Sequence, residues 1–264
     1  MVDGMFDQEF IDDNMNSFVN HLILNLQVLL WGVVIFELVM LFCIFFDQAV
    51  FLRRDTIFQV RTARKKVALT FDDGPSEFWT PRILDELKKA GIKATFFMVG
   101  FHVKKFPQIA QRVLKEGHII GNHGYAHSVL LYYTDEELEE EIKYTELVIQ
   151  EITGYKTKYF RPPKAWLGLG KKKIIKSMGY EIILWSLNSK DWVPFPHGYM
   201  VRYIVRNIKD GDILLFHDSG GVFKSRGGDR TQSVLMIPPL VKELRKKGFE
   251  FVTIEELLSD SKIS

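Results

Sequence analysis

From Val67 onward, short apolar runs alternate with amphipathic segments along this 264-residue chain. This alternation is typical of βαβ units, in which buried parallel strands alternate with helices that cover the sheet. Seven strands are one fewer than in a closed eight-stranded barrel, so we expect an α/β fold of the distorted (β/α)7 barrel type. The pattern predicts strands over 67–71, 93–98, 118–121, 157–161, 181–186, 212–216 and 249–253.

Capping residues mark the helices between these strands. Thr80 followed by Pro81 predicts a helix with Thr80 as its N-cap, and Gly91 follows its end. Residues 134–137 form a capping box, which opens a helix that stops at Gly154. The same signals predict helices over 107–117 and roughly 232–247.

A longer apolar run precedes the barrel pattern. Residues 28–46 are apolar except for Glu37, and a helix of this length crosses a hydrocarbon core of about 30 Å. We expect a retained membrane anchor. A cleaved secretory signal is the alternative, but no Lys or Arg precedes the run and no small-residue cleavage site follows it. A carboxylate in mid-span costs a few kcal/mol unless it is protonated or paired, so Glu37 hints at helix association.

The charges around the apolar run predict its orientation. Lys and Arg near the run lie only on its C-terminal side, so the positive-inside rule places the folded domain in the cytoplasm.

Composition divides the chain into several parts. The expected parts are an acidic tail (1–17), a single transmembrane helix (18–46), a basic linker (47–66), the folded domain (67–258) and a C-terminal tail (259–264).

Charge and cysteine content narrow the class of protein. The formal net charge is only +2 and no basic stripe is interleaved with aromatic residues, so we expect no nucleic-acid partner. Cys43 is the only cysteine, which excludes an intrachain disulfide and a thiolate metal cluster. No feature of the sequence indicates a protein partner.

Five motifs with polar residues follow predicted strands. Barrel enzymes build their active sites at the C-terminal ends of the strands, so we expect these motifs to share one rim of the domain. The motifs are Thr70–Pro75, Asn122–Ser128, Phe160–Pro163, Asp191–Trp192 and Leu214–Asp218.

His123 and His127 indicate a metal site. They are four residues apart, so both imidazoles project from one face of a helical turn. With a carboxylate they form a two-histidine, one-carboxylate set, which suits zinc, and Asp73 is the natural third ligand. The pair alone could be two surface histidines. With the Asp-Asp-Gly-Pro turn on the same rim, we expect a divalent metal, Zn²⁺ first, with Co²⁺ or another divalent ion as alternatives.

Two further residues suit acid–base chemistry beside such a metal. A bound cation lowers the pKa of its water from about 15.7 toward about 7, and a free carboxylate can then remove the proton during attack. Asp72 fits this role, although a turn aspartate before Gly74 is the plainer interpretation. His217, at the end of an apolar strand, could protonate a leaving amine, although a histidine there is more often structural.

The order and wording of these motifs resemble the polysaccharide deacetylases, the NodB-homology group of carbohydrate esterase family four. The resemblance covers about residues 67–258. It implies a NodB-type barrel, with Asp73 as a metal ligand, Asp72 free as general base and His217 as general acid.

The resemblance also implies supporting residues. Arg161 would pair with Asp72, and Asp191 with His217, which keeps the imidazole protonated. The backbone N–H of Lys164 would donate to the developing oxyanion. Trp192 and Leu215 look like walls of an acetyl slot, although both could be core residues. The implied substrate-binding residues are Pro163, Lys164, Trp192 and Leu215.

Three positions depart from the family pattern. Lys164 stands where an aromatic residue is usual, and basic residues occur there in muramic-acid deacetylases of the family. Its side chain is therefore a candidate to read a substrate carboxylate. Asn188 stands where aspartate is usual, and Trp166 where small residues are common.

These observations lead to one function and two alternatives. We expect a metal-dependent hydrolase that removes N-acetyl groups from amino sugars of a cell-wall polysaccharide, peptidoglycan or a related glycan. The resemblance implies a membrane-anchored enzyme with an extracytoplasmic domain, which conflicts with the flanking charges. A deacetylase of a lipid-linked amino sugar at the cytoplasmic membrane face would agree with those charges. The third hypothesis is an inactive anchored glycan-binding protein.

Overall fold

The computed structural model describes residues 8–45, 53–61, 64–220 and 228–261. The chain forms two units, Met1–Asp47 and Gln48–Ser264, which are described separately. Parts of the predicted tails and linker, namely 1–7, 47–52, 62–63 and 262–264, lie outside the described residues.

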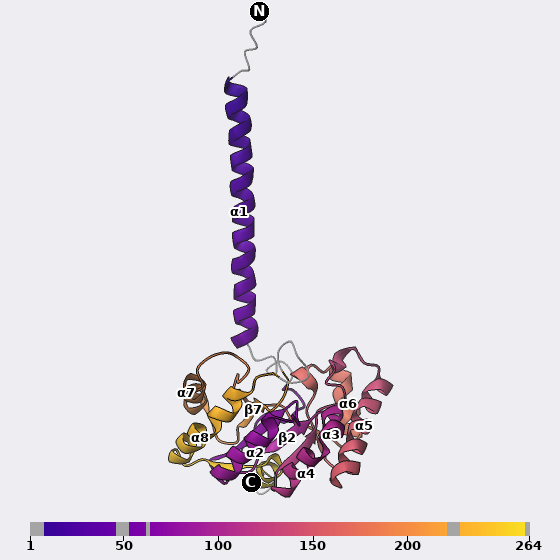
Figure 1. Ribbon diagram of the computed structural model, residues 1–264. Coiled ribbons are helices and arrows are strands. Elements are labelled where there is room, and N and C mark those ends of the chain that lie inside the picture. Colours follow the sequence, from indigo (N-terminus) through magenta and orange to yellow (C-terminus); the bar gives the residue numbers. More distant parts are fainter. Residues whose placement is uncertain (1–7, 46–52, 62–63, 221–227, 262–264) are drawn as a thin grey trace, which may run out of the picture. The chain divides into compact units, whose positions relative to one another are not determined.

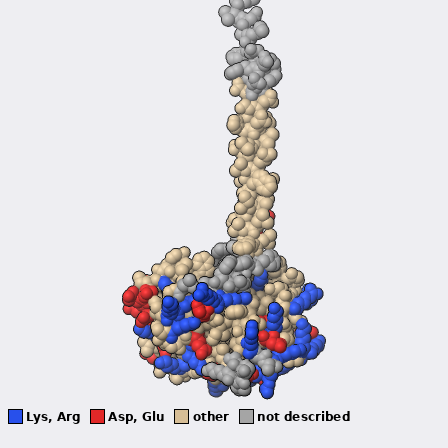
Figure 2. Space-filling view, turned by 180° about the vertical axis from the view of Figure 1, so that it is seen from behind, with Lys and Arg blue, Asp and Glu red and all other residues tan. Residues whose placement is uncertain are grey.

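The described part of the first unit is a single helix, α1 (Gln8–Phe45). At about 1.5 Å per residue this helix is about 57 Å long, more than a hydrocarbon core of about 30 Å requires. Residues Asn14–Val39 are long and apolar enough to cross a membrane, a test that a signal sequence also passes. Figure 2 shows almost no charged side chains along its described part. The helix begins inside the predicted acidic tail, where carboxylates favour a helix N-terminus.

The second unit contains a curled, parallel eight-stranded sheet surrounded by helices (Figure 1). The strand order is β5-β4-β3-β2-β1-β7-β6, and β8 also pairs with β1. The expected (β/α)7 type of architecture is confirmed, with β1 at its centre. The strands are β1 (Lys66–Asp72), β2 (Thr95–Met98), β3 (Ile119–Asn122), β4 (Tyr159–Phe160), β5 (Glu181–Ile182), β6 (Leu187–Asn188), β7 (Ile213–His217) and β8 (Glu250–Val252).

The predicted strand over 181–186 was wrong in its extent. After β5 the chain changes partner, because the Leu184 N–H donates to the carbonyl of Ile57 at 2.7 Å. It then joins β7 as a separate strand, β6. Ile57 also forms a bridge with Ile183, and Val60 is buried. Part of the segment predicted as a linker therefore packs on the barrel.

The four predicted helices are present as α2, α4, α5 and α8, and both members of the capping box at Thr134 and Glu137 are present. The prediction of Thr80 as an N-cap was wrong, because α2 begins at Trp79. The Ser76 hydroxyl accepts from the backbone N–H groups of Trp79 and Thr80 and satisfies these donors instead. The helices are α2 (Trp79–Ala90), α3 (Gly100–Lys105), α4 (Pro107–Lys115), η2 (Leu130–Tyr132), α5 (Asp135–Thr153), η3 (Pro163–Ala165), α6 (Leu169–Ser177), α7 (His197–Asn207), α8 (Thr231–Lys246) and α9 (Ile254–Ser261).

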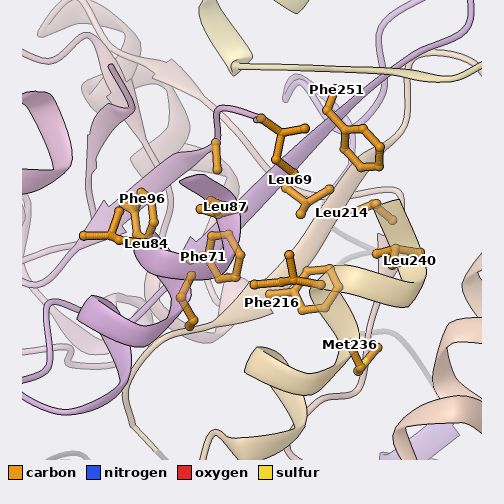
Figure 3. Packing of buried hydrophobic residues seen from close by; sticks show 14 of the residues in the cluster. Leu69, Phe71, Leu84, Leu87, Phe96, Leu214, Phe216, Met236, Leu240 and Phe251 are labelled. Carbon is orange, nitrogen blue, oxygen red and sulfur yellow. The ribbon is translucent and has the colours of Figure 1, made fainter. Parts of the chain in front are cut away.

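The main hydrophobic core fixes β1. All seven residues of β1 are buried. Figure 3 shows Phe71 between Phe96 of β2 and Phe216 of β7, with ring centroids 5.1 and 5.6 Å away. Leu84 of α2 and Leu240 of α8 belong to the same cluster. A strand held on both sides in this way presents its last residues from a rigid base.

Candidate active site

The strand register brings the predicted site residues to one rim. Asp72, the last residue of β1, stands opposite His217, the last residue of β7. Asn122 at the end of β3 stands opposite Phe160 of β4, so His123 and Arg161 leave the sheet side by side. Asp191 follows β6 and contacts His217 directly. Parallel pairing therefore gathers residues that are far apart in the sequence, as expected from the barrel pattern.

Asp73, His123 and His127 form a group that could hold a metal ion. Asp73 Oδ1 lies 2.9 Å from His127 Nε2 and 3.4 Å from His123 Nε2. One ligand atom from each residue lies within 4.8 Å of the others. The Nδ1–H of His123 donates to the Arg161 carbonyl at 2.7 Å, which leaves Nε2 with a lone pair for a cation. The donor set fits zinc or another divalent transition metal.

The backbone at this group is unusual. Asp73 has φ 78° and His127 has φ 55°, in the left-handed region that non-glycine residues rarely occupy. The carbonyl of Asp73 accepts from the Nδ1–H of buried His102 at 2.8 Å. His102 matched no motif in the sequence, and its contact with Asp73 is visible only in the structure. Such strained positions often mark functional sites.

Opposite charges stabilise the ionised forms in this group. Burial alone would raise the pKa of Asp73, but His127 and His123 hold it well below its usual value. Burial alone would lower the pKa of His127, but the Asp73 carboxylate raises it. The Lys164 side chain acts in the opposite direction on the pKa of His127, so its charge lies near the group. The ionised carboxylate of Asp73 is therefore favoured next to the imidazoles of His123 and His127.

Arg161 and Asp72 form a buried ion pair. Arg161 is fully buried, and its Nη1 donates to Asp72 Oδ1 at 2.6 Å and to the Thr70 hydroxyl at 2.7 Å. Its Nε and Nη2 donate to the carbonyls of Ile183 and Leu184, both at 3.1 Å. The guanidinium is therefore fixed by four acceptors and can orient Asp72. The second Asp72 oxygen, Oδ2, lies 3.9 Å from His123 Nε2.

His217 and Asp191 form a second pair. The Nδ1–H of His217 donates to Asp191 Oδ1 at 2.8 Å, and its backbone N–H donates to Oδ2 at 2.7 Å. The Ser233 hydroxyl of α8 also donates to Oδ2, at 2.6 Å. Burial alone would lower the pKa of His217, but the carboxylates of Asp191 and Asp73 raise it above its ordinary value. The imidazole is therefore held ready to carry a proton.

The structure also places the predicted substrate-binding residues. Lys164 is exposed in η3 with φ 56°, next to buried Pro163. Trp192 is half-buried directly after Asp191. Leu215 is buried in a hydrophobic core cluster.

Asn188 supports the turn before Asp191. Its Oδ1 accepts from the Lys190 N–H at 2.8 Å, and Lys190 has φ 56°. The amide oxygen thus fills the acceptor position that an aspartate would offer. This explains how the departure from the family pattern at Asn188 is accommodated.

Sequence reasoning missed several residues that support the site. Thr70 and Ser233 hydrogen bond to Arg161 and Asp191, and Asp218 lies under the turn that carries Asp73. Thr70 and Asp218 stood inside motifs, but nothing in the local pattern gave them a role. Burial raises the pKa of Asp218 to about 7, and the carboxylates of Asp73 and Asp72 add to this effect.

The fold and the site together define a (β/α)7 barrel with a candidate metal centre at its rim. A model of the polysaccharide deacetylase family matches residues 59–183. A peptidoglycan-N-acetylglucosamine deacetylase of Bacillus cereus is 39% identical over 206 residues, which cover 76% of this chain and 91% of that protein. The chain therefore belongs to the polysaccharide deacetylase family, and the expected NodB-type barrel and enzyme class are confirmed.

Two further comparisons agree with this assignment. The peptidoglycan-N-acetylmuramic acid deacetylase PdaC of Bacillus subtilis is 31% identical over 194 residues, covering 74% of this chain and 39% of that protein. The solved structure of the Bc1960 peptidoglycan N-acetylglucosamine deacetylase superimposes with a TM-score of 0.72 at 32% identity. That alignment covers 79% of this chain and 95% of Bc1960. The relatives support a deacetylase activity directed at the cell wall.

Proposed function

We propose that this chain is a metal-dependent deacetylase that removes N-acetyl groups from amino sugars of peptidoglycan or a related cell-wall glycan. One observation carries the proposal. The Asp73, His123 and His127 group lies at the same rim as two oriented pairs, Asp72 with Arg161 and His217 with Asp191. A metal-dependent hydrolase of this kind acts with a metal site, a base and an acid around one carbonyl, and this rim has candidates for all three.

Each residue has a distinct proposed role. Asp73, His123 and His127 would hold the cation, most simply Zn²⁺, which supplies Lewis acidity and a water of lowered pKa when bound. Asp72, oriented by Arg161, takes a proton from the attacking water.

The remaining groups act on the tetrahedral stage of the reaction. The backbone N–H of Lys164 donates to the developing oxyanion. His217, kept protonated by Asp191, gives its proton to the leaving amine, which departs as the free amino sugar. The acetyl group leaves as acetate.

The Lys164 side chain is proposed to influence which sugar is accepted. It is exposed on the rim, and its positive charge acts to lower the pKa of His127. An ammonium there could pair with a carboxylate such as the lactyl group of muramic acid. Relatives named for N-acetylglucosamine and for N-acetylmuramic acid both match this chain. Lys164→Ala should therefore reduce turnover of acidic sugars more than turnover of neutral ones.

We further propose that α1 anchors the enzyme in the cell membrane. The family resemblance favours an extracytoplasmic domain, whereas Arg53, Arg54 and Arg61 after the helix favour the cytoplasmic side. A domain in the cytoplasm would meet lipid-linked amino sugars and not the finished wall.

An inactive glycan-binding protein is the third and less favoured candidate. It has a precedent, because the solved structures similar to this chain include a Bacillus anthracis pseudoenzyme of carbohydrate esterase family four, with a TM-score of 0.70 at 26% identity. In this chain the candidate ligands, base and acid are all in place, so the enzyme is favoured.

Acetate release decides between these candidates. The full chain, stripped of metal with a chelator, is incubated with N-acetylglucosamine oligomers and with peptidoglycan, before and after Zn²⁺ or Co²⁺ is returned. We expect release of acetate that depends on the returned metal. Binding of the glycan without acetate release under any metal would support the inactive protein instead.

A further inference from the structure

The turn after β7 packs directly on the turn after β1. The Asp218 N–H donates to the Asp72 carbonyl at 3.1 Å, so the backbone segments that follow β1 and β7 remain in contact where the strands end. A Cβ at Gly220, which has φ +72°, would lie 2.2 Å from Asp73 Oδ2. The second turn therefore approaches the first so closely that a side chain at Gly220 would displace the candidate metal ligand.

The Asp218 side chain lies under the first turn. A Cβ at Gly74 would lie 2.1 Å from Asp218 Oδ2, so only a glycine fits over this carboxyl group. Asp218 is fully buried, and its Oδ2 accepts from the Thr80 hydroxyl at 2.6 Å. Its Oδ1 has no hydrogen-bond partner among the described residues. A buried carboxyl group with one oxygen lacking a partner among the described residues is costly, so its presence here calls for an explanation.

Two hydroxyl groups complete the connection. The Ser76 hydroxyl donates to the Asp218 carbonyl at 2.6 Å, and the Ser76 N–H donates to Thr80 Oγ1 at 2.7 Å. Ser76 also accepts the first N–H groups of α2, as described above. The network of Ser76, Thr80 and Asp218 thus ties the start of α2, the turn after β1 and the turn after β7 into one buried unit.

We propose that Asp218 is a positioning residue that, through Ser76 and Thr80, fixes the turn after β1, which bears Asp73, relative to the turn after β7. The base Asp72 and the acid His217 are the last residues of β1 and β7 and are paired in the sheet, whereas the metal ligand Asp73 follows the last paired residue of β1. The placement of Asp73 relative to the acid and the base therefore depends on contacts between the two turns. Asp218 touches no substrate in this scheme. It acts through the backbone that carries the reacting groups.

The effect on the reaction rests on the proposed deacetylase function, whereas the effect on the metal site does not. Loss of a residue that supports metal ligands commonly costs about 10- to 100-fold in metal affinity. Asp218→Ala removes the acceptor of Thr80 and leaves a void beneath Gly74. We therefore expect a weaker zinc affinity, by about 10-fold or more, and a lower kcat with a smaller change in KM.

The matched control is Asp212, which precedes the same strand at its other end. Asp212 is also buried, and its carboxylate accepts from Gln59 and from the Lys209 N–H. Asp212→Ala should reduce the unfolding midpoint in denaturant but leave zinc affinity and kcat as in the wild type. This contrast separates a positioning role from a general loss of stability.

Two further variants keep the proposal testable if Asp218→Ala does not fold. Asp218→Asn keeps the shape and an acceptor for Thr80, so it should restore most of the zinc affinity and kcat. Thr80→Val keeps the volume but removes the hydroxyl, so it should reproduce the loss in milder form.

The measurements are zinc affinity by chelator competition, kcat and KM for acetate release, and chemical unfolding, all on the full chain. The proposal is overturned if Asp218→Ala matches Asp212→Ala in zinc affinity, or if Asn fails to rescue while Thr80→Val has no effect. A wild-type protein that binds zinc but releases no acetate would refute the proposed function alone. The zinc affinities of the variants would still test the positioning role.

Discussion

The buried pair of Asp72 and Arg161 gives the sharpest test of the acid–base assignment. Asp72→Asn keeps a partner for Arg161 but removes the carboxylate that takes up a proton. A positioned general base contributes about 10²- to 10⁴-fold in rate, so kcat should fall by about that factor. Zinc affinity should fall much less than kcat, because Asp72 is not among the proposed ligands. Acetate release and zinc titration measure the two effects.

The control for this variant is Asp85→Asn. Asp85 also pairs with an arginine, Arg112, at 2.5 Å, but it is half-exposed and lies on the surface of the domain. Surface pairs of this kind contribute about 0–1 kcal/mol, so activity should not change. Full activity in Asp72→Asn would refute its assignment as the base.

The raised pKa of His217 predicts the pH dependence of the reaction. Burial alone would lower this pKa, and the Asp191 carboxylate reverses the effect. A raised pKa keeps the acid protonated to higher pH, so activity should persist until the pH passes that pKa. Asp191→Asn removes the charge, lowers the pKa of His217 and should move the alkaline limb of the kcat/KM profile to lower pH.

The same profile in His197→Asn serves as the comparison. His197 is an exposed histidine at the start of α7, so its loss should leave the limb in place. An unshifted alkaline limb in Asp191→Asn would show that His217 does not control it.

At the residue scale, motifs and their spacing predicted the candidate metal ligands but not the residues that support the site. The sequence placed Asp73 with His123 and His127, and the structure brings these three together. Thr70 and Ser233 could not be predicted, because they are 91 and 42 residues from the side chains that they support. Such contacts follow from strand register and helix docking, which leave no local pattern in a sequence.

At the scale of elements, we expect the buried strand β1 to contribute strongly to the stability of the domain that holds the site. Phe71 is fully buried between two aromatic neighbours, and Phe→Ala in a core costs about 3–5 kcal/mol. Phe71→Ala should reduce the free energy of unfolding by that amount, as measured by denaturant titration. Phe78→Ala is the control, because Phe78 is 50% exposed and should cost under about 1 kcal/mol. Equal losses in the two variants would contradict this account of the core.

The order of elements was predictable, and their ends were less so. The capping box at Thr134 was found because side chain and backbone satisfy each other within four residues. Thr80 was misassigned because its hydroxyl bonds to Asp218, 138 residues away, and not to the helix. The run over 181–186 was divided because its middle pairs with Ile57, a strand partner outside the predicted barrel. Local propensity could not anticipate either tertiary contact.

At the scale of the whole molecule, the orientation of the chain in the membrane decides which substrates it can reach. We test it with Cys43→Ala as background and a single cysteine on either side of α1's apolar run. Ser259→Cys reports the domain, since Ser259 is exposed on α9, and Ser17→Cys reports the N-terminal side. Intact bacterial cells are treated with a membrane-impermeant maleimide before and after lysis.

The two cysteines must behave in opposite ways if α1 spans the membrane. On family grounds we expect Ser259→Cys to be labelled in intact cells and Ser17→Cys only after lysis, which places the site next to peptidoglycan. The reverse pattern would follow the flanking arginines and direct the search to lipid-linked amino sugars. Labelling of Ser259→Cys in a product that has lost Ser17→Cys would identify a cleaved signal and remove the anchor from the proposal. Either of the two opposite labelling patterns therefore identifies the substrates that the enzyme can reach, because a single-pass enzyme can act only on the side of the membrane where its domain lies.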